Sequence, residues 1–194
     1  MTPIKIAVFA SGTGSNFDAL ANECAAGNID AEIVLMVCDK PNAACIHKAI
    51  GHKIPSLIFN PKEYDSKEAY EQEIVYHLED KGVQLICLAG YMRIVGPTLL
   101  EKYTGSILNI HPALLPSFKG AHAIDDAFNF GVKVYGVTIH WVDQSMDGGQ
   151  IVAQKAFQYE GNNRQEVERR IHAIEHKLYP STLQSIIKQR FSKK

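Results

Sequence analysis

The sequence predicts an α/β fold, in which a mostly parallel, twisted sheet carries helices on both faces and ends in an antiparallel pair of strands. Apolar runs of strand length alternate with amphipathic helical stretches along most of the chain, as in units joined by right-handed crossovers. Several of these runs are almost continuously apolar, which is typical of parallel strands buried on both faces. Two long strand-like runs then follow each other around a glycine turn, with no helical pattern between them.

The individual elements follow in chain order. Strands are expected at seven runs, which are 4–9, 32–38, 56–59, 83–89, 106–110, 134–142 and 151–159. Helices are expected at six stretches, which are 16–26, 43–50, 66–81, 96–102, 121–130 and 163–190. A break is expected in the last helix near Pro180, because proline lacks the N–H group that a helix interior uses. We expect the tail 192–194 to be frayed.

Length and composition indicate one ordinary globular domain, spanning residues 1–194. With 20 Lys and Arg against 21 Asp and Glu, the net charge is −1, which argues against a nucleic-acid partner. No apolar run approaches the roughly 20 residues of a membrane span, and the run at 6–10 is too short for a signal peptide. The four cysteines show no C-x-x-C spacing, which favours buried, reduced thiols. We therefore expect a cytoplasmic protein without a membrane partner.

A glycine-rich turn follows the first expected strand, at 11–16 (Ser-Gly-Thr-Gly-Ser-Asn). Backbone N–H groups of such a turn approach an anion closely, and the helix N-terminus adds partial positive charge. The dinucleotide-binding pattern requires a third glycine where this chain has Phe17, and the Gly-Lys-Ser/Thr of a P-loop is missing. The turn is therefore expected to bind a single phosphate group, with the side chains of Ser15 and Asn16 helping. The alternative is a turn that only caps the helix.

Asn109 and His111 lie at the end of a strand-like run, before a proline-containing segment at 112–120. Residues two apart in an extended segment point to the same side, and open α/β sheets bind ligands beyond the carboxyl ends of their strands. An amide donor beside an imidazole can bind a carbonyl oxygen that becomes an oxyanion, while the imidazole moves protons. A structural role for each residue is the alternative, but the pairing at a strand end favours function.

Three acidic or basic residues are ordinary surface residues on local evidence alone. Asp147 lies in a glycine turn, where a carboxylate is usually a turn residue. It becomes functional only if the fold brings it to His111, where it would favour the imidazolium form. Lys67 follows a helix-capping signal and reads as solvated, and Glu175 reads as a surface carboxylate of the last helix.

The remaining histidines have weaker claims to function. His172 and His176 share a helix face at a spacing that can bind a metal ion, but no third ligand has a suitable spacing, so no metal is expected. His140 is expected to be a sheet residue. His122 follows the His111 segment closely enough to line a pocket with it.

Four different short motifs occur in a defined order and spacing along the chain. They are the turn at 11–16, Leu-Ala-Gly-Tyr-Met-Arg-Ile-Val at 88–95, Leu-Asn-Ile-His-Pro at 108–112 and Met-Asp-Gly-Gly at 146–149. Each motif alone is weak, but the four together are specific. In this order and spacing the chain resembles the phosphoribosylglycinamide formyltransferase family, in its bacterial monofunctional form, from near its first residue to its last helix. The resemblance implies a Rossmann-like formyltransferase fold.

The resemblance also implies a reaction. Members of the family transfer the formyl group of 10-formyltetrahydrofolate to the amine of 5′-phosphoribosylglycinamide, in de novo purine biosynthesis. The expected partners are therefore these two small molecules, with no metal, and a homodimer is left open. Residues 1–100 would form the phosphate-binding half, and residues 101–194 the catalytic and folate-binding half.

Site roles carried over from the family fall on matching residues of this chain. Three residues would hold the substrate phosphate: Gly14, Ser15 and Asn16. One carboxylate would hold the substrate amine: Glu175. Six residues would contact the folate: Lys67, Met92, Arg93, Ile94, Val95 and Asn109. Three would be catalytic: Asn109, His111 and Asp147.

The implied catalysis uses charge and proton transfer, without a covalent enzyme intermediate. As the amine attacks the formyl carbon, Asn109 and protonated His111 would stabilise the developing oxyanion. Asp147 would keep His111 protonated and help to pass a proton from the amine to the leaving folate nitrogen.

Two positions depart from the family pattern. Ala113 stands where relatives commonly have serine, and Gln150 stands where they usually have proline. The first removes a hydroxyl next to the site, and the second is expected to loosen the loop that carries Asp147.

Three other functions compete with this interpretation. Methionyl-tRNA formyltransferase shares an Asn-x-His and a later Asp, but it carries a tRNA-binding domain and lacks the glycine turn of this chain. Formyltetrahydrofolate hydrolase uses the same catalytic set but carries an N-terminal regulatory domain, for which a first strand at 4–9 leaves no room. A non-catalytic nucleotide-binding module would use only the glycine turn. That last interpretation requires Asn109, His111 and Asp147 to lie apart in space.

Overall fold

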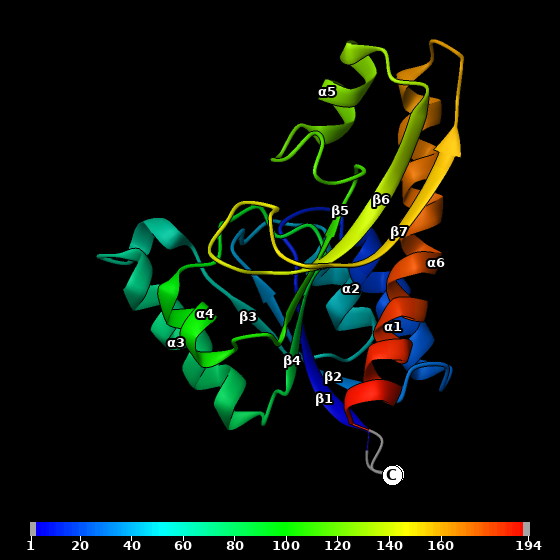
Figure 1. The fold of residues 1–194 in the computed structure, drawn as a ribbon. Helices are drawn as coiled ribbons and strands as arrows, with labels where there is room; N and C mark the ends of the chain where they lie inside the picture. Colours follow the sequence, from blue (N-terminus) through cyan, green and yellow to red (C-terminus); the bar gives the residue numbers. More distant parts are fainter. Residues whose placement is uncertain (1–2, 192–194) are drawn as a thin grey trace.

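The computed structural model describes residues 3–191, which form a single seven-stranded sheet in the order β3-β2-β1-β4-β5-β6-β7 (Figure 1). The strands are β1 (Ile4–Phe9), β2 (Ala31–Cys38), β3 (Ser56–Ile58), β4 (Leu85–Leu88), β5 (Ile107–His111), β6 (Val134–Trp141) and β7 (Ile151–Gln158). Strands β1 to β5 pair in parallel, whereas β6 pairs antiparallel with both β5 and β7. The predicted fold class, including the antiparallel C-terminal pair, is confirmed.

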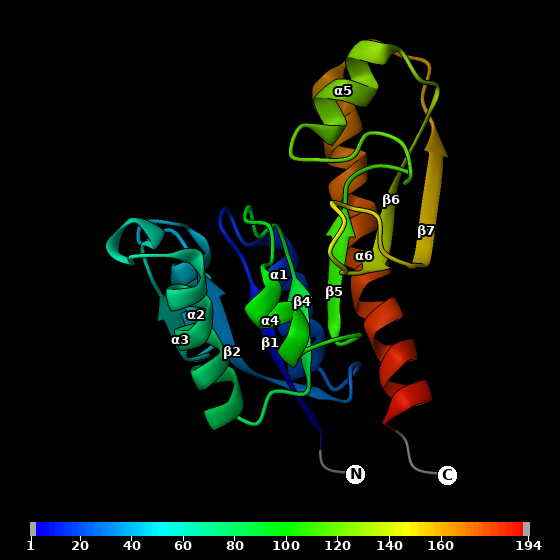
Figure 2. The same cartoon turned by 60° about the vertical axis from the view of Figure 1, so that its left-hand side comes forward.

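Helices cover both faces of this sheet. They are α1 (Ser15–Ala25), α2 (Cys45–Gly51), α3 (Lys67–Asp80), α4 (Pro97–Lys102), α5 (Ala123–Phe130) and α6 (Arg164–Arg190), and a short 3-10 turn, η1 (Pro61–Glu63), precedes α3. Helices α1, α2 and α6 lie on one face and α3 and α4 on the other, while α5 stands beyond the end of the sheet next to α6 (Figures 1 and 2). Each predicted helix and strand is present with its ends shifted by at most two residues.

The two faces give two hydrophobic clusters, as expected for strands that are buried on both sides. Phe17 of α1, at the position where the dinucleotide-binding pattern requires glycine, is fully buried in one cluster. Phe9 and Ile74 are fully buried in the other cluster, between the sheet and α3. All four cysteines are free thiols, three of them buried and Cys24 half-buried.

Helix α6 runs through Pro180 without interruption, so the predicted break is wrong. Proline removes one intrahelical hydrogen bond, but its neighbours are held by tertiary contacts. Tyr179 is buried, and its Oη donates to the carbonyls of Leu88 at 3.1 Å and Leu108 at 3.2 Å. These contacts with β4 and β5 keep the helix on the sheet. The tail 192–194 lies outside the described residues.

Hydropathy along the helices adds one further observation. Within residues 3–191, no helix combines the length and the apolar character needed to cross a membrane.

Candidate functional site

A cavity of about 600 Å³ opens at the carboxyl ends of the central strands. It lies next to the point between β1 and β4 at which the strand order reverses, which is where open α/β sheets bind ligands. Its walls come from five places: the turn after β1, the segment after β4, the end of β5 with the chain that leads into the start of α5, the end of β6 with the loop that follows it, and the first half of α6.

The phosphate turn, residues 11–16, forms one end of the cavity. Gly14 has a left-handed backbone (φ 70°) and precedes α1, and a Cβ at this position would lie 2.6 Å from the Cβ of Cys45. The first intrahelical bond runs from the N–H of Asp18 to the Gly14 carbonyl at 2.9 Å. The preceding N–H groups of the first turn, which include those of Ser15 and Asn16, therefore have no carbonyl partner within α1. Such a helix start can bind an anion.

Asn16 and Glu175 meet beside this turn, although they are far apart in the sequence. The Nδ2 of Asn16 donates to Oε2 of Glu175 at 2.9 Å, and Nδ1 of His172 contacts the same oxygen at 2.8 Å. Glu175 is 3% exposed, so its interpretation as a surface carboxylate is wrong. The other polar atom of the Asn16 side chain, its buried Oδ1, has no hydrogen-bond partner among the described residues. That oxygen can accept a hydrogen bond from an N–H or O–H of a ligand.

Asn109, His111 and Asp147 converge at the other end of the cavity. Asn109 and His111 project from the same face of β5, and the loop after β6 brings Asp147 back towards them. The Nδ1 of His111 lies 3.5 Å from Oδ2 of Asp147. Asp147 has a left-handed backbone (φ 47°), and its Oδ2 also accepts from the N–H of Gly120 at 2.7 Å. The three residues therefore meet in space, contrary to the requirement of the binding-module interpretation.

The two ring nitrogens of His111 face two oxygen atoms of other segments. Its Nε2 donates to the carbonyl oxygen of Phe118 at 2.8 Å, while its Nδ1 faces the Asp147 carboxylate. The ring is therefore oriented by Phe118 on one side and presents its other nitrogen to Asp147.

The Asp147 carboxyl is held in its ionised form. Its contact with His140, the N–H of Gly120 and the charge of His111 together lower the pKa of Asp147 to about 2, and partial burial opposes this shift. Asp147 is therefore a carboxylate at neutral pH.

His140 is a member of this cluster that the sequence analysis missed. It is a residue of β6, as expected, but its ring lines the cavity, directly opposite Asn109 in the strand pairing. Its Nδ1 lies 3.0 Å from the Trp141 carbonyl oxygen, and its Nε2 lies 3.1 Å from Nδ2 of Asn109. The same Nε2 lies 3.7 Å from Asp147. Only the β5–β6 register places His140 opposite Asn109, and the spacing along the chain does not reveal it.

The segment after β4, residues 92–95, forms an apolar wall of the cavity. Met92 and Ile94 are each 62% exposed, and Met146, which also lines the cavity, is 54% exposed, so these side chains offer apolar surface to a ligand. His122 lines the same cavity, as predicted. Lys67 is not among the lining residues; it lies at the start of α3 with its Cε close to Gly96, just beyond the wall.

The described part of the chain contains no cluster of three or more His, Cys, Asp or Glu side chains that could hold a metal ion. His172 and His176 stack with ring centroids 6.3 Å apart, and His172 binds Glu175.

The family model described as formyl transferase matches residues 4–183, which is most of the chain. The chain belongs to the formyl transferase family. Among formyl transferases, the phosphoribosylglycinamide formyltransferase of Bacillus subtilis (strain 168) is 50% identical over 184 residues, which cover 94% of each protein. The crystal structure of phosphoribosylglycinamide formyltransferase from Bacillus halodurans is 47% identical with a TM-score of 0.92, over 95% of this chain and 96% of that one. The trifunctional purine biosynthetic protein adenosine-3 of Gallus gallus is 40% identical over 184 residues, and this match spans 94% of this chain but only 18% of that protein.

Proposed function

We propose that this formyl transferase moves the formyl group of 10-formyltetrahydrofolate to the amine of 5′-phosphoribosylglycinamide, a step of de novo purine biosynthesis. The observation that carries the proposal is the convergence of Asn109, His111 and Asp147 in a cavity whose opposite end is the phosphate turn. A phosphate anchor and a polar cluster at two ends of one cavity suit a substrate with a phosphate at one end and a nucleophile at the other. We infer a cytoplasmic setting, where the free cysteines stay reduced.

The phosphate end would bind phosphoribosylglycinamide through complementary groups. Backbone N–H groups of Gly14, Ser15 and Asn16 would donate to the phosphate. The Glu175 carboxylate and the unpaired Oδ1 of Asn16 are acceptors, so they suit the donor groups of the substrate and in particular its amine.

The folate would lie against the apolar wall, residues 92–95, with Asn109 at its reactive end. Met92 and Ile94 offer exposed apolar surface to a flat ring, and the backbone of this segment offers hydrogen bonds to its edge. Lys67 lies beyond the wall, where its ammonium suits the carboxylates of the folate tail. The folate site proposed here spans both parts of the chain, because the wall belongs to residues 1–100 and Asn109 to residues 101–194.

The chemistry forms one C–N bond and breaks another. The substrate amine attacks the formyl carbon, and the carbonyl oxygen becomes an oxyanion in a tetrahedral intermediate. Asn109 donates a hydrogen bond to that oxygen, and the positive charge of His111 stabilises it. The bond from carbon to the folate nitrogen then breaks, the carbonyl re-forms, and tetrahydrofolate leaves.

Asp147 has two tasks in this scheme. Its carboxylate compensates the charge of His111, which keeps the imidazolium in place before substrate arrives. It also accepts the proton that the amine loses and returns it, through water, to the departing folate nitrogen. Because its pKa is about 2, it stays ionised between turnovers.

Formyl transfer from 10-formyltetrahydrofolate, followed by absorbance with and without phosphoribosylglycinamide, tests the proposal. We expect turnover that requires the glycinamide substrate and that collapses in the Asp147→Asn variant. Release of formate without the glycinamide would indicate a hydrolase instead. Absence of any turnover from well-folded protein would refute the proposed reaction.

A further inference from the structure

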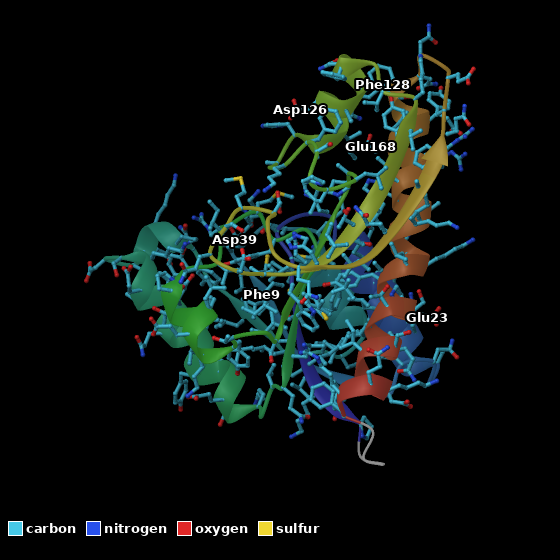
Figure 3. The ribbon with its side chains drawn as sticks, in the orientation of Figure 1. Phe9, Glu23, Asp39, Asp126, Phe128 and Glu168 are labelled. Carbon is cyan, nitrogen blue, oxygen red and sulfur yellow. The ribbon has the colours of Figure 1, made fainter. Side chains whose placement is uncertain are left out.

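A buried carboxylate outside the cavity connects the phosphate turn to the apolar wall. Asp39 follows β2 directly and is 4% exposed, among the loops at the carboxyl ends of the strands (Figure 3). It does not line the cavity, and the chemistry proposed above does not use it. Burying an unpaired charge is strongly unfavourable, so the partners of this carboxylate show what it holds together.

The two oxygens of Asp39 bind two different segments. Oδ1 accepts from the hydroxyl of Ser11, and Oδ2 accepts from Nε of Arg93 at 2.8 Å. The Ser11 hydroxyl oxygen in turn accepts from the N–H of Met92 at 2.9 Å. A closed network therefore runs from Met92 through Ser11 and Asp39 to Arg93, and its hydroxyl and carboxylate groups are all paired.

These segments are the two ligand-binding elements of the cavity. Ser11 begins the phosphate turn, and Met92 and Arg93 begin the apolar wall. A second backbone link joins them, because the N–H of Ser11 donates to the carbonyl of Gly90 at 3.1 Å. Moving either element requires the buried charge of Asp39 to lose a partner.

We propose that Asp39 is a positioning residue that couples the phosphate site to the folate site, so that binding of one substrate favours binding of the other. This inference rests on the proposed function. A ligand that orders its own element also orders the shared anchor, so the second ligand loses less conformational freedom when it binds. Such coupling is reciprocal, and a typical value changes each affinity by about fivefold or more.

Two probes that cannot react with each other allow the coupling to be measured at equilibrium. Phosphoribosylglycinamide and tetrahydrofolate bind to the two sites, and without a formyl group no transfer occurs. Isothermal titration gives the dissociation constant of each probe, alone and with the other at saturation. We expect each wild-type affinity to rise by about fivefold in the presence of the other probe.

The Asp39→Asn variant keeps the size of the side chain but loses its charge. We expect each probe to bind on its own. The coupling ratio, which is the dissociation constant of a probe alone divided by its value with the other probe at saturation, should fall to about one. Ser11→Ala removes the bridging hydroxyl, and with it one hydrogen bond of Asp39, but keeps the carboxylate itself. It is expected to give the same result, so it serves if Asp39→Asn does not fold. A variant with merely lower stability would keep its coupling ratio, because titration of the folded fraction leaves that ratio unchanged.

Glu71→Gln is the matched control. Glu71 is another buried carboxylate, but it holds only the far end of the wall, where it accepts from the N–H groups of Gly96 at 2.6 Å and Leu99 at 3.4 Å. This variant should weaken tetrahydrofolate binding and keep the coupling ratio. A coupling ratio of one in the wild type would overturn the coupling role of Asp39 and leave the proposed function intact. A ratio that stays at the wild-type value in both Asp39→Asn and Ser11→Ala would do the same. Failure of the wild type to bind either probe would instead overturn the proposed function and, with it, this inference.

Discussion

The two ends of the cavity are built in different ways. The phosphate end is a run of consecutive residues between β1 and α1, and its binding groups are backbone N–H groups whose direction follows from the positive φ of Gly14. The catalytic end joins side chains from β5, β6 and a loop, and each has at least one partner from another element.

This difference has a functional consequence. A backbone anchor tolerates changes of side chain as long as the turn keeps its shape, so damage there should appear mainly in substrate affinity. In the catalytic cluster each side chain orients the next, so damage should appear mainly in turnover and should not be additive. The following predictions test this contrast.

The largest effect is expected for Asp147→Asn. Asparagine accepts the left-handed backbone of this position, so the loop should be retained, while the proton route and the charge opposite His111 are lost. We expect kcat to fall by roughly 10³-fold, within the range for general acid–base groups. Steady-state kinetics give the value, and circular dichroism verifies the fold. A loss of less than tenfold would remove Asp147 from the catalytic cluster.

Asn109 and His140 should act as one unit. Removal of an oxyanion donor by Asn109→Ala is expected to lower kcat by roughly 10²- to 10³-fold. His140→Ala should cost less, on the order of tenfold, because it releases the Asn109 amide without removing it. If His140 acts through Asn109, the double variant will be no slower than Asn109→Ala. Multiplying effects in the double-mutant cycle would show independent roles.

At the phosphate end, Gly14→Ala should impair stability and affinity more than turnover. The added Cβ would lie 2.6 Å from Cys45 Cβ and would impose strain at φ 70°. We expect a loss of about 2 kcal/mol in unfolding free energy, a fall in Tm of roughly 4 to 8 °C, and a higher KM for phosphoribosylglycinamide. Gly12→Ala is the control, because no atom lies within 4 Å of its added Cβ. Equal effects of the two substitutions would contradict the geometry of the turn.

The smallest effect is a pH dependence of stability at Asp147. Its pKa is about 2 in the folded protein and 3.8 ordinarily, so the unfolded chain binds the proton more tightly. The stabilisation, about 2 kcal/mol, is complete above the ordinary pKa and disappears as the pH falls towards 2. Denaturant unfolding of wild type and Asp147→Asn between pH 7 and 2.5 should therefore give curves that converge at low pH. A constant difference would show that the carboxylate does not contribute through its charge.

Local patterns predicted most of the fold. A strand that is buried on both faces leaves a continuous apolar run, as at 4–9 and 134–142. A helix that is buried on one face leaves apolar residues at intervals of three or four. Both patterns can be recognised in the sequence. Pro180 was misjudged because its local cost is outweighed by the contacts of Tyr179 with β4 and β5, which lie far away in the sequence. The seven-strand order likewise follows from pairing that no single segment contains.

The site residues also fall into two groups, those that local sequence predicts and those that only long-range contacts bring together. The local sequence is enough to predict the phosphate turn, because a turn of consecutive residues carries its geometry in its own glycines. It also singled out Asn109 and His111, because alternation along one strand puts them on one side. The folded arrangement of distant segments is needed to bring Asp147 and His140 to them, to bury Glu175 against Asn16, and to place Asp39 between the two binding elements. Hydrogen bonds and ion pairs act over a few ångströms, so the partners of these side chains depend on strand register and helix packing rather than on their spacing along the chain.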